Sequence, residues 1–140
     1  MSEKIKVGIV GGAGYTSGEL LRILINHPAV SIDLINSKSN AGKPIGSVHQ
    51  DLFYSELYFT DSEAWSECEV LFLTTGHGEA VKFMEKNELP ERLKVIDLSH
   101  DFRLAEKSKS GNKQFIYGLP EMNRDKIKNA QYIANPGCFA

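Results

Sequence analysis

A cysteine near the end of the sequence is placed for nucleophilic chemistry. Cys138 closes residues 135–138 (NPGC), where proline and glycine interrupt regular structure. A helix beginning near Cys138 would lower the pKa of the thiol, and its first N–H groups would bind a developing oxyanion. Acyl transfer through a thioester needs both features. On the local residues alone, a buried structural cysteine remains an equal alternative.

A glycine-rich segment near the amino terminus has the composition of a phosphate-binding turn. Residues 11–18 read GGAGYTSG. Glycines at such a turn let backbone N–H groups approach a pyrophosphate, and the start of the next helix then faces its charge. The GxGxxG spacing is not met, so a tight turn without a ligand is the alternative. The turn predicts dinucleotide contacts from Gly11, Gly14, Tyr15, Thr16 and Ser17.

The residues about 20 positions further on favour NADP over NAD. NAD-binding proteins place a carboxylate there, which accepts hydrogen bonds from the ribose hydroxyls. Residues 36–39 (NSKS) offer a cation and two hydroxyls instead. We therefore predict that Ser37, Lys38 and Ser39 bind the 2′-phosphate of NADP. The alternative is that Lys38 is an ordinary solvated loop lysine.

Other polar residues are weaker candidates. His77 follows a predicted strand where a cofactor ribose would pass, and it is expected to line the site. In residues 98–103 (LSHDFR), Arg103 either binds a phosphate or carboxylate or pairs with Asp101 to hold the loop. The role of His49, in a predicted loop, stays open. No group of His, Asp and Glu has metal-ligand spacing, so no metal is predicted.

The elements that must position these residues alternate between strand and helix. Apolar, β-branched runs predict strands at residues 5–10, 30–36, 69–75, 94–98 and 131–134, with a minor strand at 57–59. Apolar residues at helical spacing predict helices at 17–26 and 78–87, while 37–51 and 106–114 are interpreted as loops. This order predicts an α/β, Rossmann-like, doubly wound and mostly parallel sheet. The candidate residues follow strand ends, which meet at one edge of such a sheet.

The composition describes one ordinary globular domain. The chain has 140 residues, 41% hydrophobic and 24% charged, with a net charge of −2, so no basic surface for nucleic acid or an anionic membrane is expected. No apolar run is long enough to span a bilayer, and no signal-peptide core is found. Of the two cysteines, Cys68 lies between two glutamates, which disfavour a thiolate, and is interpreted as structural. Two cysteines are too few for a disulfide framework, and this favours a reducing, cytoplasmic location.

Taken together, these motifs resemble the N-acetyl-gamma-glutamyl-phosphate reductase family. The matching pieces follow one another along the chain at residues 7–11 (VGIVG), 14–16 (GYT), 19–21 (ELL), 39–43 (SNAGK), 95–99 (VIDLS), 101–103 (DFR), 117–121 (YGLPE) and 135–138 (NPGC). The resemblance favours the catalytic role for Cys138. It makes residues 1–140 an NADP-binding domain that ends at the catalytic cysteine.

The resemblance also implies the reaction. The Cys138 thiolate would attack the acyl phosphate of N-acetyl-gamma-glutamyl phosphate, and NADPH would reduce the resulting thioester to the semialdehyde, in arginine biosynthesis. It implies a small-molecule acyl-phosphate substrate, a cytoplasmic location and, at full length, a homo-oligomer. Family members continue into a second α/β substrate domain that supplies the catalytic histidine and is absent from this chain. The chain alone is therefore predicted to be inactive.

Two residues depart from the family pattern, and two other functions are weighed. Ser17 stands where glycine is common and is expected to serve as a helix cap, and His100 stands where a smaller residue is common. An aspartate-semialdehyde dehydrogenase-like enzyme shares the chemistry but fits the GYT and DFR pieces poorly. A non-catalytic NADP-binding domain would bind the nucleotide and leave Cys138 unreactive.

Overall fold

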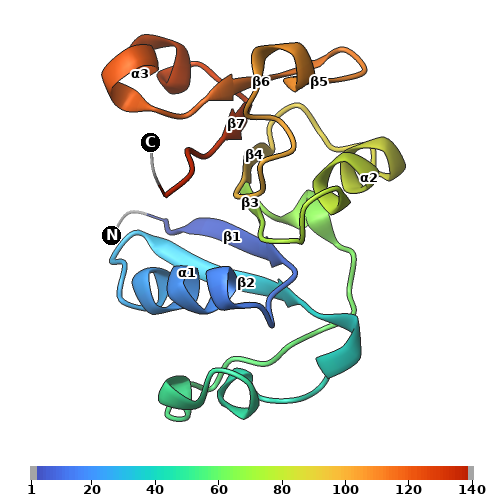
Figure 1. Ribbon diagram of the computed structural model, residues 1–140. Helices are drawn as coiled ribbons and strands as arrows, with labels where there is room; N and C mark the ends of the chain where they lie inside the picture. The colour runs from blue at the N-terminus through green and yellow to red at the C-terminus, as the bar shows by residue number, and fades with distance from the viewer. Residues whose placement is uncertain (1–2, 139–140) are drawn as a thin grey trace.

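A single mixed sheet organises the chain. The computed structural model describes residues 3–138, and its strands follow the order β2-β1-β3-β4-β7-β6-β5 (Figure 1). The strands are β1 (Ile5–Val10), β2 (Val30–Asn36), β3 (Val70–Leu73), β4 (Lys94–Asp97), β5 (Lys109–Ser110), β6 (Lys113–Tyr117) and β7 (Tyr132–Ala134). The helices are α1 (Tyr15–Ile25), α2 (Glu79–Lys86) and α3 (Pro120–Lys128). No helix within the described residues combines the length and the apolar character needed to cross a membrane.

All neighbouring strands from β2 to β6 are parallel, and only the short β5 runs antiparallel to β6. The register places Ile9 beside Ile35 on β2 and beside Phe72 on β3. The bounds of β1 and β2 agree with the sequence prediction. The predicted α/β fold with a mostly parallel sheet is therefore confirmed.

Helices cover both faces of the sheet, as in a doubly wound fold. Successive side chains of a strand point to opposite faces. On one face, Val7 and Ile9 pack with Leu21 and Leu24 of α1. On the other face, α2 contributes to a second buried cluster, whose members include Leu71, Leu73, Ala80, Met84 and Val95. The carboxyl ends of the strands are thus held by two separate apolar cores.

The carboxyl-terminal part of the chain was predicted less well. The interpretation of residues 106–114 as a solvated loop is wrong, because Lys109–Ser110 and Lys113–Tyr117 pair as a hairpin. Gly111 permits the turn between them with a φ of 61°. The buried Phe115 stacks on Phe102 at 4.0 Å between ring centroids and contacts Tyr132. These long-range contacts stabilise β6, and the local sequence does not reveal them.

Two further expectations need correction. Residues 57–59 form no strand of their own, and Tyr58 makes only an isolated bridge with Pro44. Helix α3 was not predicted, and none of its residues is buried, so it lacks the apolar stripe by which a helix is detected. The helix expected to begin near Cys138 falls on residues outside the described range.

Candidate functional site

The carboxyl ends of the parallel strands form one continuous polar edge. Backbone hydrogen bonds of 2.8–2.9 Å join each strand end to its neighbour. In each bond a backbone N–H donates to a backbone carbonyl oxygen. The pairs, donor first, are Gly12–Asn36, Thr74–Val10, Leu98–Leu73 and Asn135–Asp97. The segments that follow β1, β2, β3, β4 and β7 therefore lie side by side, as the sequence predicted for a single site.

The glycines of the turn between β1 and α1 lie in different surroundings. Gly11 has a φ of 84°, in the left-handed region that favours glycine. A Cβ on Gly12 would lie 2.4 Å from Cγ2 of Ile35, so this position is closed by packing. A Cβ on Gly14 would meet only the carbonyl oxygen of Gly11, at 3.9 Å. Gly14 is exposed, so the space around it is open to a ligand.

The residues that begin α1 divide into exposed and buried positions. Tyr15 and Thr16 are exposed in the first turn of the helix, where N–H groups lack intrahelical partners. Ser17 is fully buried, and its hydroxyl donates to the carbonyl oxygen of Gly14 at 2.7 Å. Gly14, rather than Ser17, is the N-cap residue, so the predicted capping role of Ser17 is wrong.

His49, whose role the sequence left open, supports the same turn. Its Nε2 lies 2.7 Å from the carbonyl oxygen of Gly12, and the side chain is buried. Because a carbonyl only accepts, Nε2 must carry the proton of this hydrogen bond. The ring also lies against Gly18, where a Cβ would be 2.8 Å from Nδ1. His49 thus fixes the glycine turn from a position 37 residues away, a distance over which no local pattern gives a signal.

The three residues predicted to bind a 2′-phosphate follow β2, but only two of them are exposed. Lys38 and Ser39 lie at the surface, whereas Ser37 is buried and accepts a hydrogen bond from Asn40 at 3.1 Å. Lys38 Nζ lies 3.2 Å from Oε1 of Glu63. The hydrogen bond from Lys38 and the nearby charge of Lys86 hold the pKa of the Glu63 carboxyl below its usual value. No pattern in the sequence indicates that Glu63 lies at this place.

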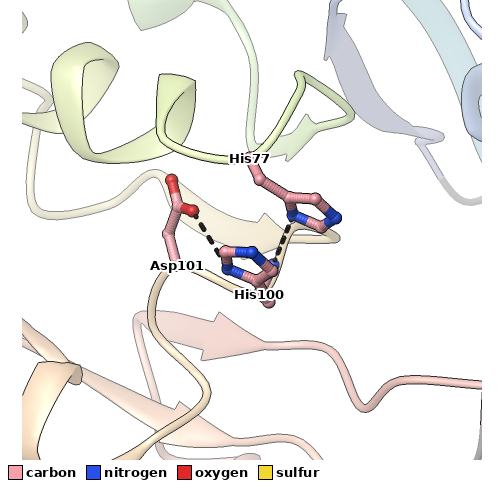
Figure 2. A group of neighbouring side chains, drawn as sticks. All are labelled: His77, His100 and Asp101. Atoms are coloured by element: carbon pink, nitrogen blue, oxygen red, sulfur yellow. Dashed lines mark hydrogen bonds and ion pairs between the residues drawn. The ribbon is translucent and has the colours of Figure 1, made fainter.

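His77, His100 and Asp101 meet where β3 and β4 end (Figure 2). The imidazole rings of His77 and His100 are stacked, with centroids 3.7 Å apart. The backbone N–H of His100 donates to Nδ1 of His77 at 3.2 Å, and His100 Nδ1 lies 3.5 Å from Asp101 Oδ1. The two carboxylate oxygens of Asp101 accept hydrogen bonds from the N–H groups of Gly78 and Val81. Asp101 therefore caps the start of α2.

The same three residues are a grouping that the sequence did not predict. Their ligand-type atoms lie within 4.8 Å of one another, although His77 and His100 are 23 residues apart. Because Asp101 is buried and both its oxygens already accept N–H groups, its present role is to hold the turn after β3. His77 is exposed at the strand-end edge, where the sequence placed it.

Arg103 connects the end of β4 to the segment that carries Cys138. Its Nε donates to the carbonyl oxygen of Asn135 at 2.8 Å, and its Nη2 donates to that of Leu98 at 3.0 Å. A Cβ on Gly137 would lie 3.0 Å from Nη1. The loop is held by these bonds to backbone carbonyls and not by the Asp101–Arg103 pair that the sequence offered as one alternative. The guanidinium lies directly beside the residue that precedes the cysteine.

The two cysteines have opposite environments. Cys138 is exposed after β7, whereas Cys68 is buried at 1% exposure. Burial raises the pKa of the Cys68 thiol, and the charges of Asp33 and Glu67 raise it further. Cys68 also fills the space beside Gly8, where a Cβ would lie 2.8 Å from Sγ. The interpretation of Cys68 as a structural residue is confirmed.

Asp97, the last residue of β4, is fully buried next to the site. Its carboxylate accepts hydrogen bonds from the N–H and the hydroxyl of Ser99, at 3.0 and 2.8 Å. Burial nevertheless raises its pKa, because the charged form is desolvated. The folded state thus binds a proton more tightly than the unfolded chain does.

The raised pKa of Asp97 predicts a pH effect. Tighter proton binding by Asp97 in the folded state adds to the free energy of unfolding. This added stability is complete below the ordinary aspartate pKa of about 3.9 and is lost as pH rises through the folded-state pKa. In Asp97→Asn, the amide oxygen can still accept from Ser99 while the titration is removed. We expect this variant to gain stability relative to the original chain as pH rises from 4 to 7. Urea unfolding at several pH values measures the difference, and a constant difference would contradict it.

Comparison with known proteins identifies related sequences and folds. The family described as semialdehyde dehydrogenase, NAD binding domain, matches residues 6–130. N-acetyl-gamma-glutamyl-phosphate reductases from Phocaeicola vulgatus and Flavobacterium johnsoniae are 55% and 50% identical over 97% of the chain. The chain spans only 41% and 42% of the length of these relatives.

Solved structures show the same fold at low sequence identity. Aspartate semialdehyde dehydrogenase II from Vibrio cholerae, complexed with ASA, is 19% identical, with a TM-score of 0.67 over 98% of this chain and 43% of its own. The Candida albicans aspartate semialdehyde dehydrogenase with NADP is 18% identical, with a TM-score of 0.64 over 96% of this chain and 43% of its own. At these identities the likeness concerns the fold alone.

Proposed function

Because this chain belongs to the semialdehyde dehydrogenase NAD-binding domain family, we propose that it is the NADP-binding and nucleophile-bearing part of an N-acetyl-gamma-glutamyl-phosphate reductase. The observation that carries the proposal is the placement of an exposed cysteine on the same strand-end edge as an open glycine turn. Relatives at 50–55% identity with that name support the choice of substrate.

The edge has the features that a dinucleotide requires. The backbone around Gly14 is open, and the first turn of α1 would offer its unpaired N–H groups to a pyrophosphate. Thr75 Oγ1 is buried without a hydrogen-bond partner in the described structure, and Thr75 lies against Gly11. Gly11, Gly14, Tyr15 and Thr16 would hold the pyrophosphate, and His77 would lie beside the ribose. NADPH held by these residues would supply the hydride that reduces the acyl group.

Cys138 performs the first chemical step in this proposal. Its thiolate attacks the acyl carbon of the substrate, a C–S bond forms, and the C–O bond to phosphate breaks as inorganic phosphate leaves. Exposure of Cys138 makes the attack sterically feasible. The resulting thioester is the species that is then reduced to the aldehyde, with release of the thiol.

Arg103 holds the segment that leads to Cys138 and carries the charge suited to the leaving phosphate. Two of its nitrogens are fixed on the carbonyl oxygens of Asn135 and Leu98, and the third lies beside Gly137. A guanidinium in this position stabilises the negative charge that develops on a phosphate. The general acid or base that completes the reaction comes from outside this chain in the proposal.

The cofactor part is tested by calorimetric titration of the 140-residue chain with NADPH and NADH. NADPH is expected to bind more tightly, and Lys38→Ala should weaken NADPH binding about threefold to tenfold and leave NADH binding unchanged, since an exposed cation contributes modestly. Lys128→Ala on α3 removes the same charge far from β2 and serves as the control. Tighter binding of NADH, or binding of neither nucleotide, would contradict the proposal.

A further inference from the structure

An ion triad bridges the end of β2 and helix α2. Oε1 of Glu63 lies 3.2 Å from Nζ of Lys38 and 3.5 Å from Nζ of Lys86. Lys38 follows β2, Lys86 closes α2, and Glu63 comes from the segment that leads to β3. Three elements distant in sequence therefore converge on one carboxylate oxygen.

The triad borders a cavity at the strand-end edge. The cavity has a volume of about 200 Å³, and its lining includes Lys38, Glu63, Lys86 and Thr75. Thr75 carries the buried hydroxyl oxygen that has no hydrogen-bond partner in the described structure. The cavity thus places the two cations of the triad beside an unsatisfied polar atom, next to the strand end where the adenosine ribose would lie under the proposed function. A third lysine of the lining, Lys82, pairs with Glu79 at 3.2 Å.

We propose that Lys38 and Lys86 form the binding site for the 2′-phosphate of NADP, and that Glu63 occupies this site until the phosphate displaces it. The inference rests on the proposed cofactor, and it adds a second cation and a competing anion to the recognition of that cofactor.

Charge and geometry favour the exchange. A phosphate monoester carries nearly two negative charges at neutral pH and three acceptor oxygens, whereas a carboxylate carries one charge and two oxygens. Two ammonium groups that already approach a single oxygen can therefore each bind an oxygen of the phosphate. Glu63 is 42% exposed, so its side chain can turn into solvent when the phosphate arrives.

The exchange assigns different effects to the three residues. The lysines increase affinity for NADPH, and Glu63 decreases it, because its interactions must be broken and its charge repels the phosphate. None of these interactions involves NADH, which has hydroxyls at this place. Glu63 and Lys86 therefore determine how strongly the two nucleotides are distinguished.

The test is calorimetric binding of NADPH and NADH to the 140-residue chain and to Glu63→Gln and Lys86→Gln. NADPH affinity is expected to rise about threefold to tenfold in Glu63→Gln and to fall by a similar factor in Lys86→Gln, as for ion pairs at exposed positions. NADH affinity should stay within about twofold. Asp125→Asn and Lys128→Gln on α3 make the same charge changes away from the triad, and circular dichroism checks that each variant is folded.

The outcomes separate this inference from the proposed function. If the original chain binds neither nucleotide, both are overturned. If it prefers NADPH but Glu63→Gln binds NADPH no more tightly than Asp125→Asn does, only the exchange is overturned. If Glu63→Gln loses NADH affinity instead, Glu63 contacts the ribose hydroxyls. The proposal that the phosphate displaces Glu63 is then wrong.

Discussion

Replacing Cys138 with serine is expected to lower reductase turnover by at least about 10³-fold, because a hydroxyl is a far weaker nucleophile than a thiolate at neutral pH. NADPH binding should be retained, since Cys138 is exposed and no described contact of the glycine turn involves it. The loss would therefore appear in the chemical step and not in cofactor affinity.

The measurement needs a protein that contains the rest of a reductase. Residues 1–138 can replace the corresponding part of one of the bacterial reductases that share 50–55% identity with this chain. Turnover of the acyl phosphate, together with a mass-spectrometric search for the acylated cysteine, then reports on Cys138 directly. Cys68→Ala is the matched control, because it removes the buried thiol and should leave turnover nearly intact.

Cysteine labelling of the 140-residue chain adds a second readout. Iodoacetamide should modify the exposed Cys138 readily and the buried Cys68 only after unfolding. A hybrid in which Cys138→Ser keeps its turnover would contradict the catalytic role. A chain that binds NADPH while Cys138 resists labelling would favour a non-catalytic nucleotide-binding domain.

The sequence predicted the central strands well because their local signals are strong. β1 and β2 are short β-branched runs, with a glycine turn after the first and His27–Pro28 before the second, and these boundaries need no tertiary information. The positions of the candidate residues followed from one rule, that parallel strands place their carboxyl ends at the same edge.

The sequence could not predict the contacts that connect distant segments. His49 holds the glycine turn, Asp101 caps α2, and Glu63 pairs with Lys38, yet no local pattern in the sequence indicates any of these contacts. Ser17 is an example in which a local pattern was followed and misled. Serine is a favourable N-cap residue in general, but Ser17 is buried at the third position of the helix and does not cap it. Tertiary packing decides such roles.

Gly12 and Gly14 of the turn should differ in how much stability they lose when each is replaced by alanine. Gly12→Ala is expected to lower the free energy of unfolding by about 3 kcal/mol, because the methyl group would lie 2.4 Å from Cγ2 of the buried Ile35. Gly14→Ala should cost less than about 1 kcal/mol, since its φ of −81° suits alanine and the new methyl group meets no atom closer than 3.9 Å.

For NADPH affinity, Gly14→Ala should be the variant with the large effect. The methyl group of Gly14→Ala would stand in the open space where a pyrophosphate must approach the backbone, so NADPH binding should weaken more than about tenfold in a chain that remains folded. Thermal unfolding followed by circular dichroism gives the stabilities, and calorimetry gives the affinities. If Gly14→Ala binds NADPH as tightly as the original chain, the turn does not hold the pyrophosphate, and its glycines would serve only the packing that Gly12 already demonstrates.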